Sequence, residues 1–156
     1  KVDDVIMVTG TLGGSILKKH LVFKPRLKEG LLLNKKFNIN SMIDISDGLA
    51  GDLNHILEES GVGAVLYEDA VPISADAKKL ARKTGFSALH HALHDGEDYE
   101  LLFTLSDKES KKLLASRSFP VRLSKIGHIK RSKGISMQGS DGKLKKIKPV
   151  GYKHFN

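Results

Sequence analysis

The residues with the clearest chemical potential are two aspartates and a serine that follow a short apolar stretch. They lie in the run Ile43-Asp44-Ile45-Ser46-Asp47-Gly48, directly before a helical pattern that begins at Leu49. A helix start presents unpaired backbone N–H groups and the positive end of the helix dipole, and both attract phosphate oxygens. Carboxylates beside a helix start can ligate the Mg²⁺ that accompanies nucleotide phosphates. The run therefore predicts phosphate and magnesium chemistry at a strand-to-helix junction.

Two interpretations of these side chains compete. Ser46 or Asp47 could be the N-cap of the following helix, which is a common structural role. An N-cap does not account for Asp44, which is expected at the C-terminal end of a strand, where ligands bind in open α/β sheets. Two carboxylates in so small a space repel each other unless a cation relieves the charge. We therefore predict that Asp44 and Asp47 are metal ligands.

A second acidic loop follows later in the chain, in the run Gly96-Glu97-Asp98-Tyr99-Glu100-Leu101. Its glycine permits an unusual backbone conformation or a close approach to a ligand. Glu97 lies beside this glycine at the expected tip of the loop, and we predict a functional role for it. Asp98 and Glu100 lead into an expected strand, so we interpret them as parts of a polar turn. Together the two loops are a stronger signal than either alone.

Two further motifs carry weaker signals. His90, His91 and His94 suggest a zinc site, but no other His or Cys has supporting spacing, so zinc is not predicted. The segment Thr9–Gly14 is rich in glycine and superficially resembles a phosphate loop. It lacks the Lys-Ser/Thr pair that a Walker A loop requires, so we interpret it as a strand-to-helix turn.

Length and composition indicate one globular domain. The chain has 156 residues, of which 40% are apolar, enough for one sizeable core. It has no cysteine, which excludes disulfides and thiolate metal sites and favours a reducing, cytoplasmic location. No apolar run approaches the roughly 18 residues of a membrane span, and no signal-peptide pattern appears. Because the first residue is Lys1 and not Met, we expect a fragment of a longer protein.

The net charge of +8 is concentrated near the C-terminus. The section Val121–Asn156 has ten Lys/Arg and one acid, a local charge of +9, whereas the preceding 120 residues have 16 basic and 17 acidic residues. A basic surface can attract polyanions. No aromatic residues are interleaved with the basic ones, and Lys143, Lys145 and Lys146 fit the solvated side of a strand. Nucleic-acid binding is therefore not our prediction.

The hydrophobic pattern predicts alternating strands and helices. Strands are expected at Val5–Thr9, Met42–Ile45, Ala64–Tyr67, Tyr99–Thr104, Val121–Lys130, Gly134–Met137 and Leu144–Lys148. Helices are expected at Ser15–Leu21, Pro25–Phe37, from Leu49 to a stop at Gly61, and at Asp76–Lys83, Ser87–Leu93 and Asp107–Arg117. This order predicts an α/β fold, a layered sandwich with one mixed sheet flanked by helices, in a single domain over residues 1–156.

Several of these motifs resemble the C-terminal half of thiamine-monophosphate kinase (ThiL). The similar segments are Val8–Gly13, Lys24–Leu27, Ser41–Leu53, His55–Leu57, Gly61–Ala64, Gly96–Thr104 and Gly151–Phe155. They span nearly the whole chain, and their combination is specific. The wider PurM-like superfamily, which includes aminoimidazole ribonucleotide synthetase and selenophosphate synthetase, is expected to share the fold but not the Gly-Glu-Asp-Tyr-Glu-Leu run.

The resemblance implies a PurM C-terminal-domain-like fold and phosphoryl transfer from ATP to thiamine phosphate, with several Mg²⁺ ions. It implies that Asp44 and Asp47 ligate Mg²⁺ and that Ser46 contacts ATP. It also implies that Glu97 contacts the thiamine substrate and that Tyr152 packs on it. Phosphoryl transfer depends mostly on positioning and charge neutralisation, which suits these residue types. A carboxylate and an aromatic ring also suit a cationic substrate.

Two departures from the family pattern stand out. The loop usually reads Gly-Gly-Glu-Asp, whereas Asp95 here replaces the first glycine and adds a charge beside Glu97. The family's N-terminal half, which supplies most of the ATP and Mg²⁺ site and the homodimer contacts, is not in the chain. We therefore expect the isolated chain to be inactive. The alternative is a non-catalytic, stand-alone ligand-binding module of the same fold, which binds a polyanion through the basic C-terminal section.

Overall fold

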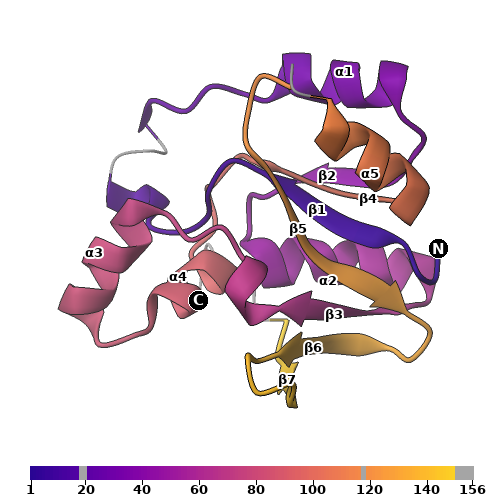
Figure 1. Ribbon diagram of the computed structural model, residues 1–156. Helices are drawn as coiled ribbons and strands as arrows, with labels where there is room; N and C mark the ends of the chain where they lie inside the picture. Colours follow the sequence, from indigo (N-terminus) through magenta and orange to yellow (C-terminus); the bar gives the residue numbers. More distant parts are fainter. Residues whose placement is uncertain (18–20, 117–118, 150–156) are drawn as a thin grey trace.

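The computed structural model describes residues 1–17, 21–116 and 119–149, and a seven-stranded sheet forms its centre (Figure 1). The strand order is β2-β4-β1-β5-β3-β6-β7, and every neighbouring pair is antiparallel except β3 and β6. The strands are β1 (Val5–Thr9), β2 (Ile39–Asp44), β3 (Gly63–Tyr67), β4 (Leu101–Leu105), β5 (Leu123–Lys130), β6 (Gly134–Gln138) and β7 (Leu144–Ile147). The predicted single mixed sheet is confirmed.

The helices lie on both sides of this sheet and at one end of it (Figure 1). They are α1 (Leu27–Lys36), α2 (Leu49–Ser60), α3 (Ala75–Thr84), α4 (Ala88–His94) and α5 (Asp107–Ala115), with short 3-10 helices η1 (Ser15–Leu17) and η3 (Glu68–Ala70). Ser74, Ser87 and Ser106 are N-caps of α3, α4 and α5, each accepting a backbone N–H of the first turn. Each of these serines satisfies a backbone N–H group that would otherwise have no partner within its helix.

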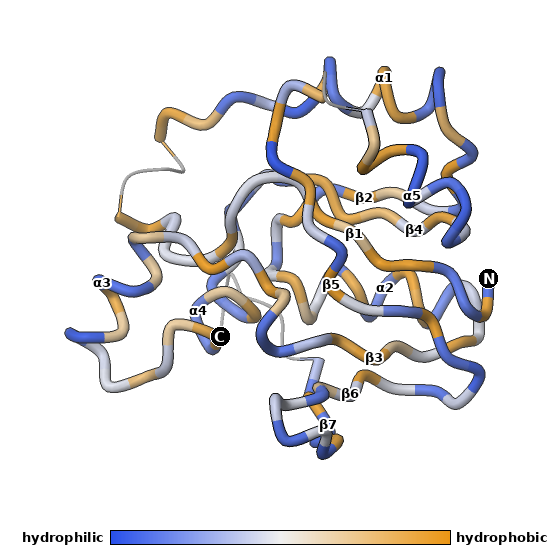
Figure 2. The backbone as a smooth tube through the Cα atoms, viewed as in Figure 1, coloured by the Kyte–Doolittle hydropathy of each residue, from blue (hydrophilic) through white to orange (hydrophobic). Residues whose placement is uncertain are grey.

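The sheet separates two hydrophobic cores. Side chains alternate between the faces of a strand, so Ile6 and Val8 of β1 belong to one core and Val5 and Met7 to the other. The first core includes buried residues of α2 and α4, and the second includes buried residues of α1 and α5. The trace along β1 and β3 is largely hydrophobic (Figure 2). No helix in the described ranges is both long and apolar enough to cross a membrane.

The strand directions bring the predicted site residues to one end of the sheet. β4 pairs antiparallel with both β1 and β2, with Asp44 opposite Leu101 and Val8 opposite Leu102. The C-terminal ends of β1 and β2 therefore lie beside the N-terminal end of β4. The expectation that ligands bind near Asp44 relied on the rule that ligands bind at the C-terminal ends of strands in open, mostly parallel α/β sheets. In this structure that end of the sheet is formed by strands of opposite direction. The two acidic loops and the glycine-rich turn after β1 meet at this end.

The expected strand starting at Tyr99 is wrong by two residues. The strand begins at Leu101, because Tyr99 has a φ of 51° and Glu97 has a φ of 54°, both outside the extended region. The expected helix at Ser15–Leu21 is the 3-10 helix η1 over its first three residues. Leu21, where the described structure resumes, has 3-10 geometry, and residues 22–25 after it are irregular. Tyr99 is therefore a loop residue and not part of the sheet.

Candidate functional site

The two acidic loops are joined by backbone hydrogen bonds. Ile45 N–H donates to the carbonyl of Glu100, and Tyr99 N–H donates back to the carbonyl of Ile45, both at 2.8 Å. Glu97 N–H donates to the carbonyl of Ser46 at 2.8 Å. These bonds continue the pairing of β2 with β4 past the strand ends. They bring Ser46 and Glu97, two of the predicted site residues, next to each other.

Two glycines make this junction possible. Gly48 has a φ of 99°, and a Cβ on it would lie 2.9 Å from the carbonyl oxygen of Leu93 at the end of α4. Gly96 has a φ of 72°, and a Cβ there would press on the carbonyl of Ser46. Both values lie in the region that disfavours side chains. Glycine is therefore required on both loops for their close approach.

The alternative interpretation of Ser46 or Asp47 as the N-cap of α2 is wrong. The N-cap of α2 is Gly48, and no side chain caps the helix by a hydrogen bond. Instead, Asp52 in the first turn of α2 accepts the backbone N–H groups of Ser46 and Asp47, both at 3.0 Å. The loop therefore folds back onto its own helix, and the acid that fixes it lies downstream. Sequence reasoning missed Asp52.

Asp52 concentrates negative charge inside the loop. Its side chain is buried, and burial raises its pKa to about 6, against the two backbone hydrogen bonds, which lower it. The nearby carboxylates of Asp47 and Asp44 raise the pKa of Asp52 further. The charges of Asp44 and Asp47 therefore both act on one buried acid. A cation at this position would relieve the repulsion.

The donors present at this loop fit a divalent cation. Asp47, Asp52 and His55 place ligand atoms within 4.8 Å of one another, the one such group of three found in the described part of the chain. Asp44, at the exposed end of β2, is not a member of this group. The carboxylate oxygens suit Mg²⁺, which prefers oxygen ligands, whereas an imidazole is not a typical Mg²⁺ ligand. The structure thus adds Asp52 and His55 to the predicted neighbourhood of Asp47.

The second loop also fixes the glycine-rich turn after β1. Both carboxylate oxygens of Asp98 accept Gly13 N–H at 2.9 Å, and Ser15 Oγ donates to Asp98 at 2.6 Å. Asp98 is fully buried. These hydrogen bonds occupy the Gly13 amide that a phosphate loop would offer to its ligand. The geometry agrees with the interpretation of this segment as a strand-to-helix turn and of Asp98 as structural.

Glu100 joins the same turn to the start of α1. Arg26 donates to its carboxylate through Nε at 2.7 Å and Nη2 at 2.8 Å, and Thr9 Oγ1 donates at 2.7 Å. The hydrogen bonds to Glu100 raise the pKa of Arg26 above its usual value. A bidentate pair of this kind fixes direction as well as distance. Glu100 therefore has a structural role, as the sequence suggested.

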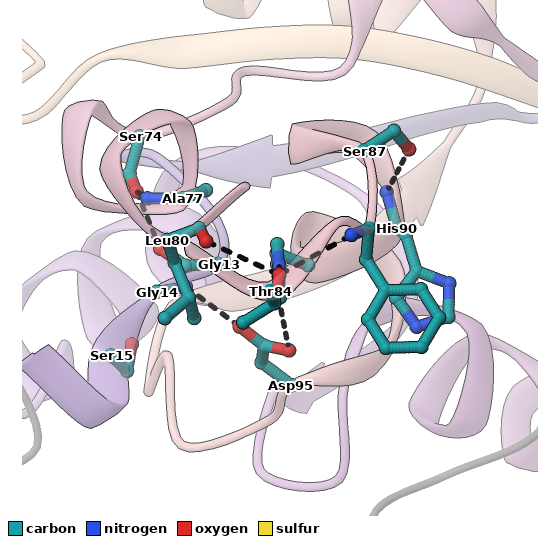
Figure 3. Close-up of polar contacts among 12 residues, drawn as sticks. Gly13, Gly14, Ser15, Ser74, Ala77, Leu80, Thr84, Ser87, His90 and Asp95 are labelled. Carbon is teal, nitrogen blue, oxygen red and sulfur yellow. Dashed lines mark hydrogen bonds and ion pairs between the residues drawn. The ribbon is translucent and has the colours of Figure 1, made fainter. Parts of the chain in front are cut away.

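Asp95 is directed toward the glycine turn and the helix α4 (Figure 3). It accepts Gly14 N–H at 3.1 Å and contacts His91 Nδ1 at 2.9 Å. The other nitrogen of His91, Nε2, lies 2.8 Å from Thr84 Oγ1 at the end of α3. The carboxylate of Asp95 therefore contacts the buried His91 and the Gly14 amide. His91 is engaged in this contact and is not available as a zinc ligand.

An apolar cavity of about 590 Å³ borders the exposed end of β2. Asp44 lies in its lining, and Phe23 stacks on Tyr99 there, with ring centroids 4.0 Å apart. The rest of the lining is Pro25, Arg26, Leu27, Gly30, Leu31, Met42, Ile43 and Leu101. Sequence reasoning missed this aromatic pair, because it placed Tyr99 in a strand. Tyr152, the predicted aromatic of the substrate site, lies outside the described residues.

A comparison with protein families identifies the domain type. The family model described as AIR synthase related protein, C-terminal domain, matches residues 1–140. The chain belongs to this family. The thiamine-monophosphate kinase of Rhodopirellula baltica is 35% identical over 151 residues, which are 97% of this chain and 48% of that protein. The enzyme of Aquifex aeolicus is 29% identical, over 99% of this chain and 53% of that protein. The chain spans about half the length of the curated relatives it matches.

Solved structures give the same family and fold. The thiamine-monophosphate kinase of Stenotrophomonas maltophilia K279a matches 93% of this chain and 52% of its own, with a TM-score of 0.77 and 30% identity. AaThiL complexed with AMPPCP and TMP matches 99% of this chain and 52% of its own, with a TM-score of 0.79 and 29% identity. E. coli HypE, a hydrogenase maturation protein, is 18% identical with a TM-score of 0.77 over 100% of this chain and 51% of its own, a likeness of fold alone. The predicted resemblance and the PurM-like fold are confirmed.

The role of Asp98 can be tested by the stability of the chain. In Asp98→Asn, one of the two oxygens that face the Gly13 amide becomes an NH₂ group, so a buried donor meets a donor. We expect the free energy of unfolding, measured by urea denaturation, to fall by about 1–3 kcal/mol. The matched variant Asp69→Asn, at an exposed position of η3, should change it by no more than about 0.5 kcal/mol. Equal free energies of unfolding for Asp98→Asn and Asp69→Asn would contradict the structural role of Asp98.

Proposed function

We propose that this chain is the C-terminal domain of an ATP-dependent thiamine-phosphate kinase, which converts thiamine phosphate and ATP to thiamine diphosphate and ADP. The observation that carries the proposal is the meeting of the two acidic loops at one sheet end, through the hydrogen bonds of Ile45, Glu97 and Tyr99. These loops contain the motifs that resemble thiamine-monophosphate kinases. The similarity to such enzymes over 97% of the chain supports the same function.

The first loop has the chemistry that phosphoryl transfer needs. In this proposal Asp44 and Asp47 ligate Mg²⁺, and Ser46 contacts ATP. When bound, Mg²⁺ would neutralise charge on the transferring phosphate oxygens. Asp52 fixes the backbone from which Ser46 and Asp47 project, because it accepts both of their N–H groups. No protein nucleophile is required for this reaction, and the proposal assigns none.

The second loop supplies the proposed contact to thiamine phosphate. Glu97 is half-buried, and its backbone N–H donates to the carbonyl of Ser46, so Glu97 and the proposed ATP-contacting residue are neighbours. A carboxylate suits the cationic thiazolium ring of thiamine. For Tyr152 the proposal rests on the sequence alone: its ring would pack on the substrate.

The other half of the kinase completes the proposed site. The relatives are about twice as long as this chain, and we propose that the remaining half contributes most of the nucleotide and metal contacts and the homodimer interface. AaThiL was solved with AMPPCP and TMP together, so a related enzyme accommodates two ligands. The 156-residue chain alone is then expected to have no kinase activity.

A chimera tests the proposed function. This chain replaces the matching region of the Rhodopirellula baltica enzyme, and formation of thiamine diphosphate from ATP and thiamine phosphate is measured by chromatography. We expect activity in the chimera and none in the isolated chain. A circular-dichroism melt shows whether the chimera is folded. A folded chimera that forms no thiamine diphosphate, or an isolated chain that forms it, would contradict the proposal.

The metal role of the first loop is tested in the same chimera. Asp44→Asn and Asp47→Asn should each lower kcat by about 10²-fold or more, because each removes a charge that stabilises the transferring phosphates. The melting temperature should stay unchanged or rise slightly, since one repulsive charge near Asp52 is lost. Glu59→Gln, at an exposed position of α2, is the matched control and should keep the parent rate. Near-parental rates of both aspartate variants at limiting Mg²⁺ would exclude the metal role.

The substrate role of Glu97 and Tyr152 predicts a selective change in KM. Glu97→Gln and Tyr152→Ala should raise KM for thiamine phosphate by about tenfold to hundredfold, the usual cost of losing a contact to a charged group. KM for ATP should change much less, and it is the internal control. Equal changes in both values would mean that the residues only shape the loop, and an unchanged KM for thiamine phosphate would remove them from the site.

A further inference from the structure

The two edge strands of the sheet differ in their protection against pairing with another strand. β7, at one edge, has four residues, and two of them are Lys145 and Lys146. β2, at the opposite edge, has six residues and no basic side chain. Short length and lysine side chains are common means by which proteins block an exposed edge. β2 lacks both of these protections.

The outer side of β2 presents backbone groups that are suited to strand pairing. Ile45 N–H donates to the carbonyl of Glu100, and the Ile45 carbonyl accepts Tyr99 N–H, so the backbone groups of Ile45 are directed to the β4 side. Because this direction alternates along a strand, the N–H and C=O groups of Met42 and Asp44 are directed away from β4. Within the described ranges, β4 is the one strand that pairs with β2. The outer edge therefore offers a row of donors and acceptors to a further strand.

An apolar groove lies beside this edge. It is the cavity of about 590 Å³ between α1 and β2. Gly30 of α1 lies over β2, since a Cβ on Gly30 would be 3.8 Å from Met42 Cε. Leu27 and Leu31 line the same cavity and are 72% and 71% exposed. Exposed apolar side chains that gather on one surface indicate an interaction site, unlike those that are scattered singly. We call Leu27, Leu31, Met42 and the outer edge of β2 the α1–β2 surface.

The α1–β2 surface suits a two-fold contact with a second copy of the chain. Antiparallel pairing of β2 with itself about its middle gives a closed contact, in which the same surface is used on both copies. The two-fold axis is then perpendicular to the sheet, so both α1 helices lie on the same face of the continued sheet. The two apolar grooves adjoin each other across the axis. Strand pairing and burial of the exposed leucines thus come from one arrangement.

The charges at the two ends of β2 are complementary in the same arrangement. Asp44, the one charged residue of β2, is exposed at the C-terminal end of the strand. Lys35 and Lys36 are exposed at the end of α1, and two residues separate them from the start of β2. Antiparallel pairing places the Asp44 end of one copy beside the lysine end of the other. It also keeps the two Asp44 carboxylates apart.

We propose that the α1–β2 surface binds a second copy of this chain and forms a symmetric dimer with the two β2 strands paired antiparallel. The opposite charges at the two ends of one strand favour a second copy over an unrelated partner, because they match each other only across a two-fold axis. The proposal is independent of the kinase function, and its test uses no enzymatic readout.

The test is sedimentation equilibrium of the 156-residue chain over a range of concentrations, together with amide hydrogen exchange by NMR. We expect a monomer–dimer equilibrium with a Kd on the order of 10 μM. Exchange of the Met42 and Asp44 amides should slow as the dimer forms, whereas the amides of β7 at the other edge should not change. A monomer at every concentration, assemblies larger than a dimer, or a dimer without slower exchange of these two amides would each overturn the proposal.

Two double variants that replace the same number of exposed leucines separate this surface from general hydrophobic association. Leu27→Gln/Leu31→Gln should raise the Kd of the dimer about tenfold or more, because apolar area is no longer buried. Leu114→Gln/Leu144→Gln, at leucines that are 49% and 60% exposed and outside the cavity lining, should leave the Kd unchanged. Circular-dichroism melts show whether both variants keep the parent fold. Equal weakening in the two folded variants would contradict the proposal.

A charge exchange tests the antiparallel orientation. Asp44→Lys should weaken the dimer about tenfold or more, since like charges then meet at both ends of the contact. Adding Lys35→Asp and Lys36→Asp to the same chain should restore the Kd, because each end again joins opposite charges. A triple variant that dimerises no better than Asp44→Lys alone would overturn the proposed arrangement.

Discussion

Buried carboxylates are the constraint on which the rest of this structure depends. Three loops meet at one end of the sheet, and their backbone N–H groups cannot all be paired within the sheet itself. A buried amide without a partner is costly. Asp98 accepts the Gly13 amide, Asp95 the Gly14 amide, and Asp52 the amides of the loop after β2. Asp95 and Asp98 of the second acidic loop thus satisfy the backbone of the glycine-rich turn, whereas Asp52 satisfies the loop directly before its own helix.

This arrangement has an electrostatic consequence. Acids that organise the loops also make the sheet end negative, and the pKa of Asp52 is raised mainly by burial and further by the carboxylates of Asp47 and Asp44. Phosphate chemistry at this end therefore requires a cation. The basic residues lie elsewhere, concentrated in the C-terminal section, and some of them face α4 from β7.

The sequence was sufficient for most of the elements and for the choice of the two acidic loops as candidate site segments. Periodicity and flanking glycines gave most strands and helices to within two residues, because these signals are local. Asp52 was missed because its role depends on a local turn in which the N–H groups of Ser46 and Asp47 reach its carboxylate. Helical periodicity does not predict such a turn. The N-cap interpretation of Ser46 and Asp47 is wrong because Gly48, with a φ of 99°, takes the cap position. The contacts of Asp95 depend on α3 and α4, which only the fold brings together.

Backbone strain marks the same place as the proposed chemistry. Glu97 and Tyr99 have positive φ values of 54° and 51°, a conformation that costs on the order of 1–3 kcal/mol for residues other than glycine. Each N–H group is bound to the segment after β2, Glu97 to Ser46 and Tyr99 to Ile45. The strain persists because these bonds and the buried Asp98 between them fix the loop on both sides. A relaxed loop would extend β4 by two residues and would place Tyr99 in the sheet. The strained loop instead places Tyr99 against Phe23 and keeps Glu97 beside Ser46, so the strain fixes where two residues of the candidate site lie.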